Sequence, residues 1–166
     1  SHKANLSSLL RTRELRGARH NHDLMRATVS SNLKEWKSWK GLSNDVTSMA
    51  WSPDGTKFVV GATAHDDQYN RRNNLVFGDI SKSMVHELPD HHILWESHAA
   101  TADERLFPTV CSIQWVDKLL YTASYDGTVK VWNTDLRSSK IPICFRTLKH
   151  DSNVRVMGVS DSMPHL

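Results

Sequence analysis

Residues 123–133 carry the strongest structural signal in this 166-residue sequence and read Ala123-Ser124-Tyr125-Asp126-Gly127-Thr128-Val129-Lys130-Val131-Trp132-Asn133. The Asp126-Gly127 pair is typical of a tight hairpin turn, because glycine readily adopts the positive φ that such turns require. After the turn, apolar and polar residues alternate along the chain up to Trp132, which is the pattern of a β-strand. The stretch therefore predicts a β-hairpin.

Two longer segments of the sequence share one pattern. Residues 46–61 and 110–124 each begin with Val, place Trp five positions later, and continue through a short turn into an apolar run. Ser52-Pro53-Asp54-Gly55 is one of these turns, since proline and glycine preset its backbone. A third unit begins at His150, with residues 154–159 as its first predicted strand. Polar stretches at 65–74 and 97–108 make the first repeat longer than the usual ~40–45 residues.

This pattern resembles the WD-repeat family of β-propellers. In that family the turn aspartate accepts a hydrogen bond from a histidine in the loop before the blade. The histidine forms a hydrogen bond with the hydroxyl group of a strand residue, and that hydroxyl group forms one with a tryptophan indole. The resemblance assigns these places to Asp126, His98, Thr122 or Ser124, and Trp132. Because a buried carboxylate needs donors, these residues are expected to be structural rather than catalytic.

The other units depart from the family pattern. In the first, Leu42 follows Gly41 where histidine is expected, and Gly78 stands where the tryptophan belongs, so apolar packing must hold that blade together. The sequence predicts an all-β fold, a partial WD-repeat β-propeller of about three blades preceded by a short N-terminal helix. Since propellers typically close with four to eight blades, we expect an excerpt of a larger propeller. The predicted parts are a basic segment at 1–32 and propeller at 33–166.

The first forty residues are basic, with nine Lys/Arg and three Asp/Glu, while the remainder is slightly acidic. Residues 5–16 are predicted to form a short helix with Asn5 as N-cap and Gly17 after its end. This helix resembles the helical box ahead of the propeller in substrate receptors of cullin-4 ubiquitin ligases. The resemblance implies docking to the ligase's triple-propeller adaptor through Leu6, Leu9, Leu10, Arg11, Arg13, Leu15 and Arg16. Packing of the helix on its own propeller is the alternative.

Runs at 39–46, 69–75 and 87–92 are similar to fungal propeller proteins of this receptor class, and most closely to the propeller subunit of the heterochromatin ligase. That likeness implies a nuclear, non-enzymatic scaffold that works with other subunits of a ligase or of a histone lysine-9 methylation complex. One family feature is missing, because no arginine stands two positions after Asn133. Binding to nucleic acid or nucleosomes through the basic head, or a general scaffold role, are the alternatives; salt-sensitive affinity would favour the former.

Arg71 and Arg72 interrupt a polar loop and are candidates for contact with phosphate or an acidic partner, against the simpler reading of a solvated loop. Trp36 and Trp39 are expected to be packing residues rather than a platform for stacked bases. Cys111 and Cys144 lie in apolar runs and are expected to be buried, reduced thiols, which fits the cytosol or nucleus.

No catalytic signature is present: the sequence has no glycine-rich phosphate loop and no H-E-x-x-H motif. His91 and His92 follow Asp90, but neighbouring side chains on an extended chain point to opposite sides, so no metal site is expected. No apolar stretch approaches the ~18 residues that cross a membrane. We therefore expect no cofactor, no small-molecule substrate and no membrane association.

Overall fold

The computed structural model describes residues 26, 29–31, 33–64, 71–89, 91–94, 105–135, 137 and 139–160. The chain divides into two compact units, Ser1–Trp39 and Lys40–Leu166. In the described part of the first unit, residues 29–31 are helical and residues 33–39 form neither helix nor strand. The helix predicted at 5–16 lies outside the described residues. No helix in the described part of the chain is long and apolar enough to span a bilayer.

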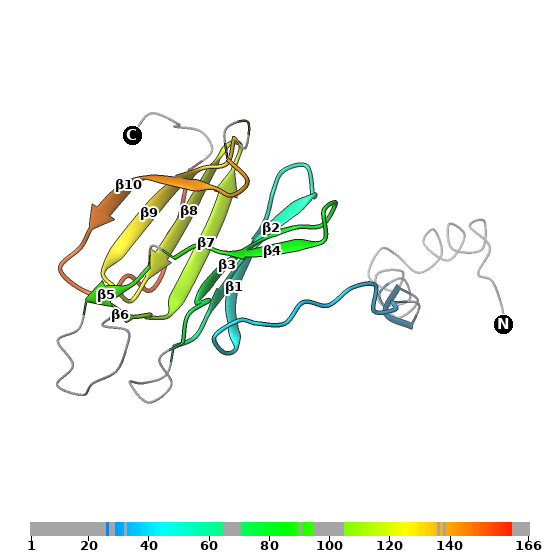
Figure 1. The fold of residues 1–166 in the computed structure, drawn as a ribbon, viewed down its shortest axis with the longest axis horizontal. Coiled ribbons are helices and arrows are strands. Elements are labelled where there is room, and N and C mark those ends of the chain that lie inside the picture. Colours follow the sequence, from blue (N-terminus) through cyan, green and yellow to red (C-terminus); the bar gives the residue numbers. More distant parts are fainter. Residues whose placement is uncertain are drawn as a thin grey trace, which may run out of the picture. The chain divides into compact units, whose positions relative to one another are not determined.

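The first sheet of the second unit has four antiparallel strands in the order β1-β2-β3-β4 (Figure 1). These strands are β1 (Val46–Trp51), β2 (Lys57–Ala62), β3 (Leu75–Asp79) and β4 (Met84–Glu87). The predicted turn between β1 and β2 is confirmed, because the Gly55 amide donates to the Ser52 carbonyl at 2.8 Å. Strand β3 is buried along its whole length, as its apolar composition requires.

The second sheet repeats this arrangement with β7 (Val110–Val116), β8 (Leu119–Ser124), β9 (Thr128–Asn133) and β10 (Ile143–Lys149). The predicted hairpin joins β8 to β9, and Gly127 in its turn has φ 75°. A small ribbon of β5 (Ile93–Leu94) and β6 (Arg105–Leu106) stands in the long connection between the two sheets. This ribbon lies within the extra length of the first repeat.

The two sheets are joined face to face by one apolar core. It comprises Val59, Leu75, Phe77, Leu88, Val110, Ile113, Leu120 and Trp132, all buried. At the edge where β1 and β7 meet, the Thr47 hydroxyl donates to the Val110 carbonyl, and the Ser48 hydroxyl accepts from the Ile113 amide at 3.0 Å. Shared apolar burial and these hydrogen bonds make the sheets neighbouring blades.

Residues 153–160 do not form the strand that the sequence predicts, since no strand pairs with them among the described residues. They nevertheless form hydrogen bonds with β7 of the second sheet, and these resemble the hydrogen bonds that β1 of the first sheet forms with β7. The Cys111 thiol donates to the Val154 carbonyl at 2.8 Å, and Cys111 occupies the repeat position of Thr47. The Gln114 amide donates to Met157 and accepts from the Val159 amide. The structure therefore has two complete blades and the docked first segment of a third.

Both cysteines are free thiols, but each is only partly buried, so the expectation of full burial is wrong. The reason lies in their strands. Cys111 faces the segment around Val154, and Cys144 lies on β10, the outermost strand of its sheet. Cys144 packs against the core between the two blades but stays partly exposed, and Cys111 is not among the residues that form or contact that core.

Candidate functional site

A buried chain of hydrogen bonds runs through the second blade from strand to loop. The Trp132 indole N–H donates to the Thr122 hydroxyl at 2.9 Å, and Thr122 lies 2.7 Å from His91 Nε2. His91 Nδ1 lies 2.7 Å from the Asp126 carboxylate. An ionised carboxylate only accepts hydrogen bonds, so Nδ1 donates to Asp126. Every polar group along this path therefore has a partner.

The Asp126 carboxylate ends this chain and also fixes the hairpin turn. Its other oxygen accepts from the Thr128 amide at 2.8 Å and from the Thr128 hydroxyl at 2.7 Å. Burial raises the pKa of Asp126, but the hydrogen bond and electrostatic attraction from His91, together with the bonds from Thr128, outweigh it. The pKa of Asp126 consequently lies below its ordinary value, and the charged form stabilises the fold.

We expect this pairing to appear in the pH dependence of stability. A carboxyl group whose pKa is lowered on folding contributes stability above its unfolded pKa, and that contribution is lost as the pH falls through the folded value. As the pH drops from about 5 to about 3, the free energy of unfolding measured by urea denaturation should therefore fall more for the parent chain than for Asp126→Asn. Equal losses in the two proteins would show that Asp126 does not couple folding to protons.

The histidine of this network is His91, so the assignment of that place to His98 is wrong. His91 is fully buried and uses both ring nitrogens, whereas His98 lies outside the described residues. Of the two hydroxyl candidates, Thr122 joins the chain, while the Ser124 hydroxyl donates to the Thr109 carbonyl at 2.9 Å. The neighbouring His92 points elsewhere, with Nδ1 2.9 Å from the Pro89 carbonyl.

Asn74 of the first blade holds the loop that carries His91, a role that the sequence analysis missed. Its side chain is fully buried, and its amide nitrogen donates to the His91 carbonyl at 2.9 Å and to the Pro108 carbonyl at 2.7 Å. These two acceptors flank the β5–β6 ribbon, so one amide closes the base of the insertion. Asparagine after a run of loop residues usually indicates a turn, and its burial gave no sequence signal.

The β2–β3 connection and the connection that carries the β5–β6 ribbon form what we call the loop face of the blades. The hydrogen bonds of Asn74 and His91 hold the base of these loops in place. Arg71 and Arg72 are exposed on the β2–β3 connection of this face. The next residue, Asn73, takes a left-handed conformation with φ 69°, and its amide donates to the Glu87 carboxylate at 3.3 Å. On the ribbon, Leu94 is 76% exposed. Exposed cations and an exposed apolar side chain on a rigid support are typical of a surface that contacts partners.

The described part of the first unit presents aromatic surface as well. Trp36 is 74% exposed, so the expected packing of this residue is not found there. Lys37 Nζ lies 5.7 Å from the ring centre of Trp36 and 5.3 Å from that of Trp39. Each distance fits a cation–π contact.

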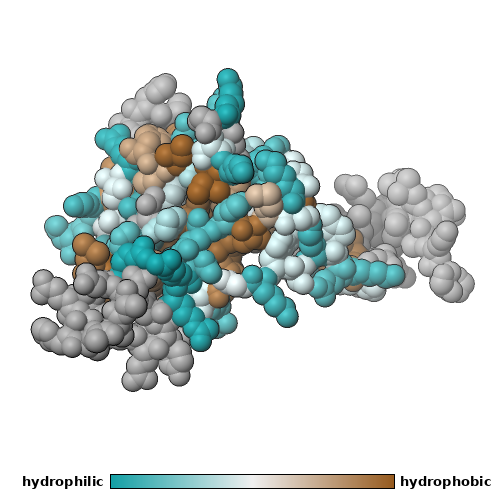
Figure 2. All heavy atoms as spheres, in the orientation of Figure 1, coloured by the Kyte–Doolittle hydropathy of each residue, from teal (hydrophilic) through white to brown (hydrophobic). Residues whose placement is uncertain are grey.

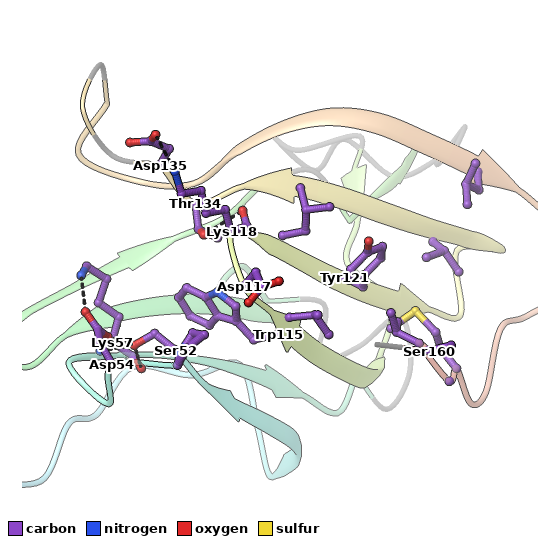
Figure 3. Close-up of a pocket in the computed structure, with 18 of the residues that line it drawn as sticks. Ser52, Asp54, Lys57, Trp115, Asp117, Lys118, Tyr121, Thr134, Asp135 and Ser160 are labelled. Carbon is purple, nitrogen blue, oxygen red and sulfur yellow. Dashed lines mark hydrogen bonds and ion pairs between the residues drawn. The ribbon is translucent and has the colours of Figure 1, made fainter. Parts of the chain in front are cut away.

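A hollow of about 1260 Å³ runs from the β1–β2 and β7–β8 turns along the face of the second sheet to residues 157–160 (Figure 3). The Trp115 indole lies between the β1–β2 turn and Asp117. Charges around the hollow form ion pairs with each other: Lys57 Nζ lies 3.7 Å from the Asp54 carboxylate, and Arg137 Nε lies 3.2 Å from the Asp135 carboxylate. These paired groups stabilise turns, and their arrangement does not resemble a nucleophile with an adjacent base.

Comparisons with known proteins agree with this architecture. Residues 33–69 and 107–133 match the WD domain, G-beta repeat family. Rik1-associated factor 1 of Schizosaccharomyces pombe is 32% identical over 116 residues, which are 69% of this chain and 17% of that protein. The solved structure of the Dos1 propeller matches 80% of this chain and 30% of its own, with 24% identity and a TM-score of 0.63. That likeness shows the fold.

The family match at residues 107–133 includes the strands β8 and β9, which carry Thr122 and Trp132 of the buried network, and the Asp126 turn between them. The chain spans about a sixth of the length of the curated relative that it matches. The two sheets are WD40-repeat blades of a β-propeller, and over 69% of its length the chain is similar to a segment of Rik1-associated factor 1.

Proposed function

We propose that the chain is a non-catalytic WD-repeat subunit of a cullin-4-type ubiquitin ligase that acts in heterochromatin formation in the nucleus. The similarity to Rik1-associated factor 1 carries this proposal, because that protein's name records an association with Rik1. The blades suit such a role. Their buried polar network holds the sheet together, and the exposed loops remain available to partners.

Within this proposal, the basic N-terminal segment docks to the adaptor of the ligase. Leu9 and Leu10 form the centre of the docking residues. We call the whole set the N-terminal box, and it comprises Leu6, Leu9, Leu10, Arg11, Arg13, Leu15 and Arg16. A short amphipathic helix of this kind is marginal in isolation and gains stability when its apolar face enters a groove. The Rik1 counterpart of the source organism is the first adaptor to test. Other subunits of the ligase or of the histone methylation machinery would contact the propeller loops.

The test is a pull-down of the purified Rik1 counterpart by the chain. We expect Leu9→Asp/Leu10→Asp to abolish capture, since two charges would have to enter an apolar groove. Leu33→Asp is the matched control, because Leu33 is 73% exposed and lies outside the box; it should leave capture unchanged. Undiminished capture by the double variant would contradict docking through the box.

The same proteins test the alternative that the basic head binds nucleic acid. Binding of a DNA duplex that falls steeply with salt, and that persists in Leu9→Asp/Leu10→Asp, would favour a nucleosome or nucleic-acid role. Weak binding with a flat salt response would count against it.

A further inference from the structure

The loops of the loop face are tied together beneath the surface of the molecule. On the face shown in Figure 2, hydrophilic and hydrophobic residues are interspersed. The residues that join the loops contribute almost nothing to the molecular surface, since Asn74 and His91 are fully buried and Thr109 is 6% exposed. Two loops meet at these residues. One is the β2–β3 connection (residues 63–74), and the other joins β4 to β7 (residues 88–109) and is called the ribbon connection, because it carries β5 and β6.

Each end of the β2–β3 connection is hydrogen bonded to the ribbon connection. At its start, the Ala64 amide donates to the Thr109 hydroxyl at 2.8 Å, and this hydroxyl donates to the Ala64 carbonyl at 3.1 Å. At its end, the Asn74 side chain donates to the carbonyls of His91 and Pro108. Because His91 and Thr109 lie near the two ends of the ribbon connection, the first blade holds both of those ends.

The same two ends are attached to the second blade. At one end, the His91 ring belongs to the buried network and donates to the Asp126 carboxylate. At the other end, the Thr109 carbonyl accepts from the Ser124 hydroxyl at 2.9 Å and from the Tyr125 amide at 3.0 Å. These two donors come directly before Asp126 in the chain. The ribbon connection therefore bridges the β2–β3 connection of the first blade and the β8–β9 turn of the second.

Asn74 carries a cost that its bonds to the ribbon connection must offset. Its Oδ1 is buried and has no hydrogen-bond partner among the described residues. A buried polar atom without a partner is unfavourable, and burial of an amide is tolerated only when its other hydrogen bonds compensate for the lost water. In the described part of the chain, both hydrogen bonds of this side chain go to the ribbon connection rather than to its own blade. The amide at position 74 thus acts on the neighbouring blade.

We propose that Asn74 is a latch through which the first blade positions His91, so that the buried network of the second blade is complete only while the first blade holds the ribbon connection. The β2–β3 connection, which carries Arg71 and Arg72, and the ribbon connection, which carries Leu94, then move as one unit. A partner that shifts either loop loosens the network, and loss of the network releases both loops. This coupling does not depend on the ligase assignment.

Hydrogen exchange at the network tests the latch. The probes are the Nδ1–H of His91 and the indole N–H of Trp132, followed by NMR of the full chain. Asn74→Ala leaves the carbonyls of His91 and Pro108 unpaired, so we expect both protons to exchange about tenfold faster or more through local opening. Val60→Ala is the matched control, because Val60 is buried in the same sheet and belongs to neither connection.

The rates are compared after urea has brought the parent chain and both variants to the same equilibrium constant for unfolding, so that global unfolding contributes equally to exchange. Exchange in Val60→Ala should then match that of the parent chain within about twofold. Equal rates in Asn74→Ala and Val60→Ala would overturn the proposal, since Asn74 would then be an ordinary buried residue. If Asn74→Ala does not melt cooperatively, Asn74→Ser, which shortens the side chain and keeps one donor, takes its place with the same outcomes.

The coupling must also act in the opposite direction, because a coupling free energy between two sites is reciprocal. Asp126→Asn weakens the network, so it should speed the exchange of the Ala64 amide, which donates to Thr109, by about threefold or more under the same matching of stability. The Ser52 amide, which is hydrogen bonded within the β1–β2 turn of the same sheet, should keep its rate. If the Ala64 and Ser52 amides respond alike, the two connections do not move as one unit and the latch is refuted.

Discussion

Trp132→Ala should lower the free energy of unfolding by about 3–5 kcal/mol, because it empties a large volume in the core between the blades. Trp132 is 1% exposed and packs with Phe77 and Leu120 in that core. The substitution also removes the donor to the Thr122 hydroxyl, so it breaks the network as well as the packing. Urea denaturation followed by circular dichroism measures the change.

Two variants divide this effect into its parts. Trp132→Phe keeps most of the ring volume but loses the indole N–H, and we expect a loss of about 1–3 kcal/mol. Trp36→Ala removes a tryptophan that is 74% exposed, and it should change stability by less than about 0.5 kcal/mol. If Trp132→Ala were no more harmful than Trp36→Ala, the second blade could not be organised around this residue.

The second large effect is expected at Gly78, the position where the first blade lacks its tryptophan. A Cβ atom at Gly78 would lie 2.2 Å from Cζ of Phe58 and less than 3 Å from two further ring atoms. The Phe58 ring therefore covers the backbone of β3 at the place where the second blade carries an indole. Gly78→Ala should cost about 1–3 kcal/mol or more, since a buried ring must move to accept the methyl group.

The cause of that loss can be tested by a double-mutant cycle. Phe58→Ala leaves a cavity, but it also removes the clash, so Gly78→Ala should cost far less in the Phe58→Ala background than in the parent chain. Gly158→Ala is the control, because a Cβ at Gly158 meets nothing within 4 Å. If the effects of the two substitutions on the free energy of unfolding were additive, the Phe58 ring would not be the reason that glycine stands at position 78.

The sequence predicted the blades because their signals are local. Alternation along a strand, a proline–glycine turn after Trp51 and the Asp126-Gly127 turn each follow from a few neighbouring residues. The all-β propeller fold and both of these turns are found in the structure. The missing strand at 154–159 has a different cause, since a strand exists only when another chain segment pairs with it.

The histidine of the buried network was misassigned because the number of residues between this histidine and the first strand of its blade differs from one repeat to the next. In the third unit His150 stands four residues before Val154, but His91 stands 19 residues before Val110. The β5–β6 ribbon takes up the difference, and Asn74 holds its two ends together. Long-range contacts of this kind leave no periodic pattern in a sequence. The role of Asn74 was missed for the same reason.

The contacts between successive blades have a consequence for how the propeller assembles. Thr47 and Cys111 hold equivalent positions, and each donates to the first carbonyl of the next segment, at Val110 and Val154. Each completed sheet is thus a template on which the following one is laid. A structure built in this way gains its cooperativity from nearest neighbours, as a row of coupled units does. Damage to one unit should spread to the adjoining unit and fade beyond it.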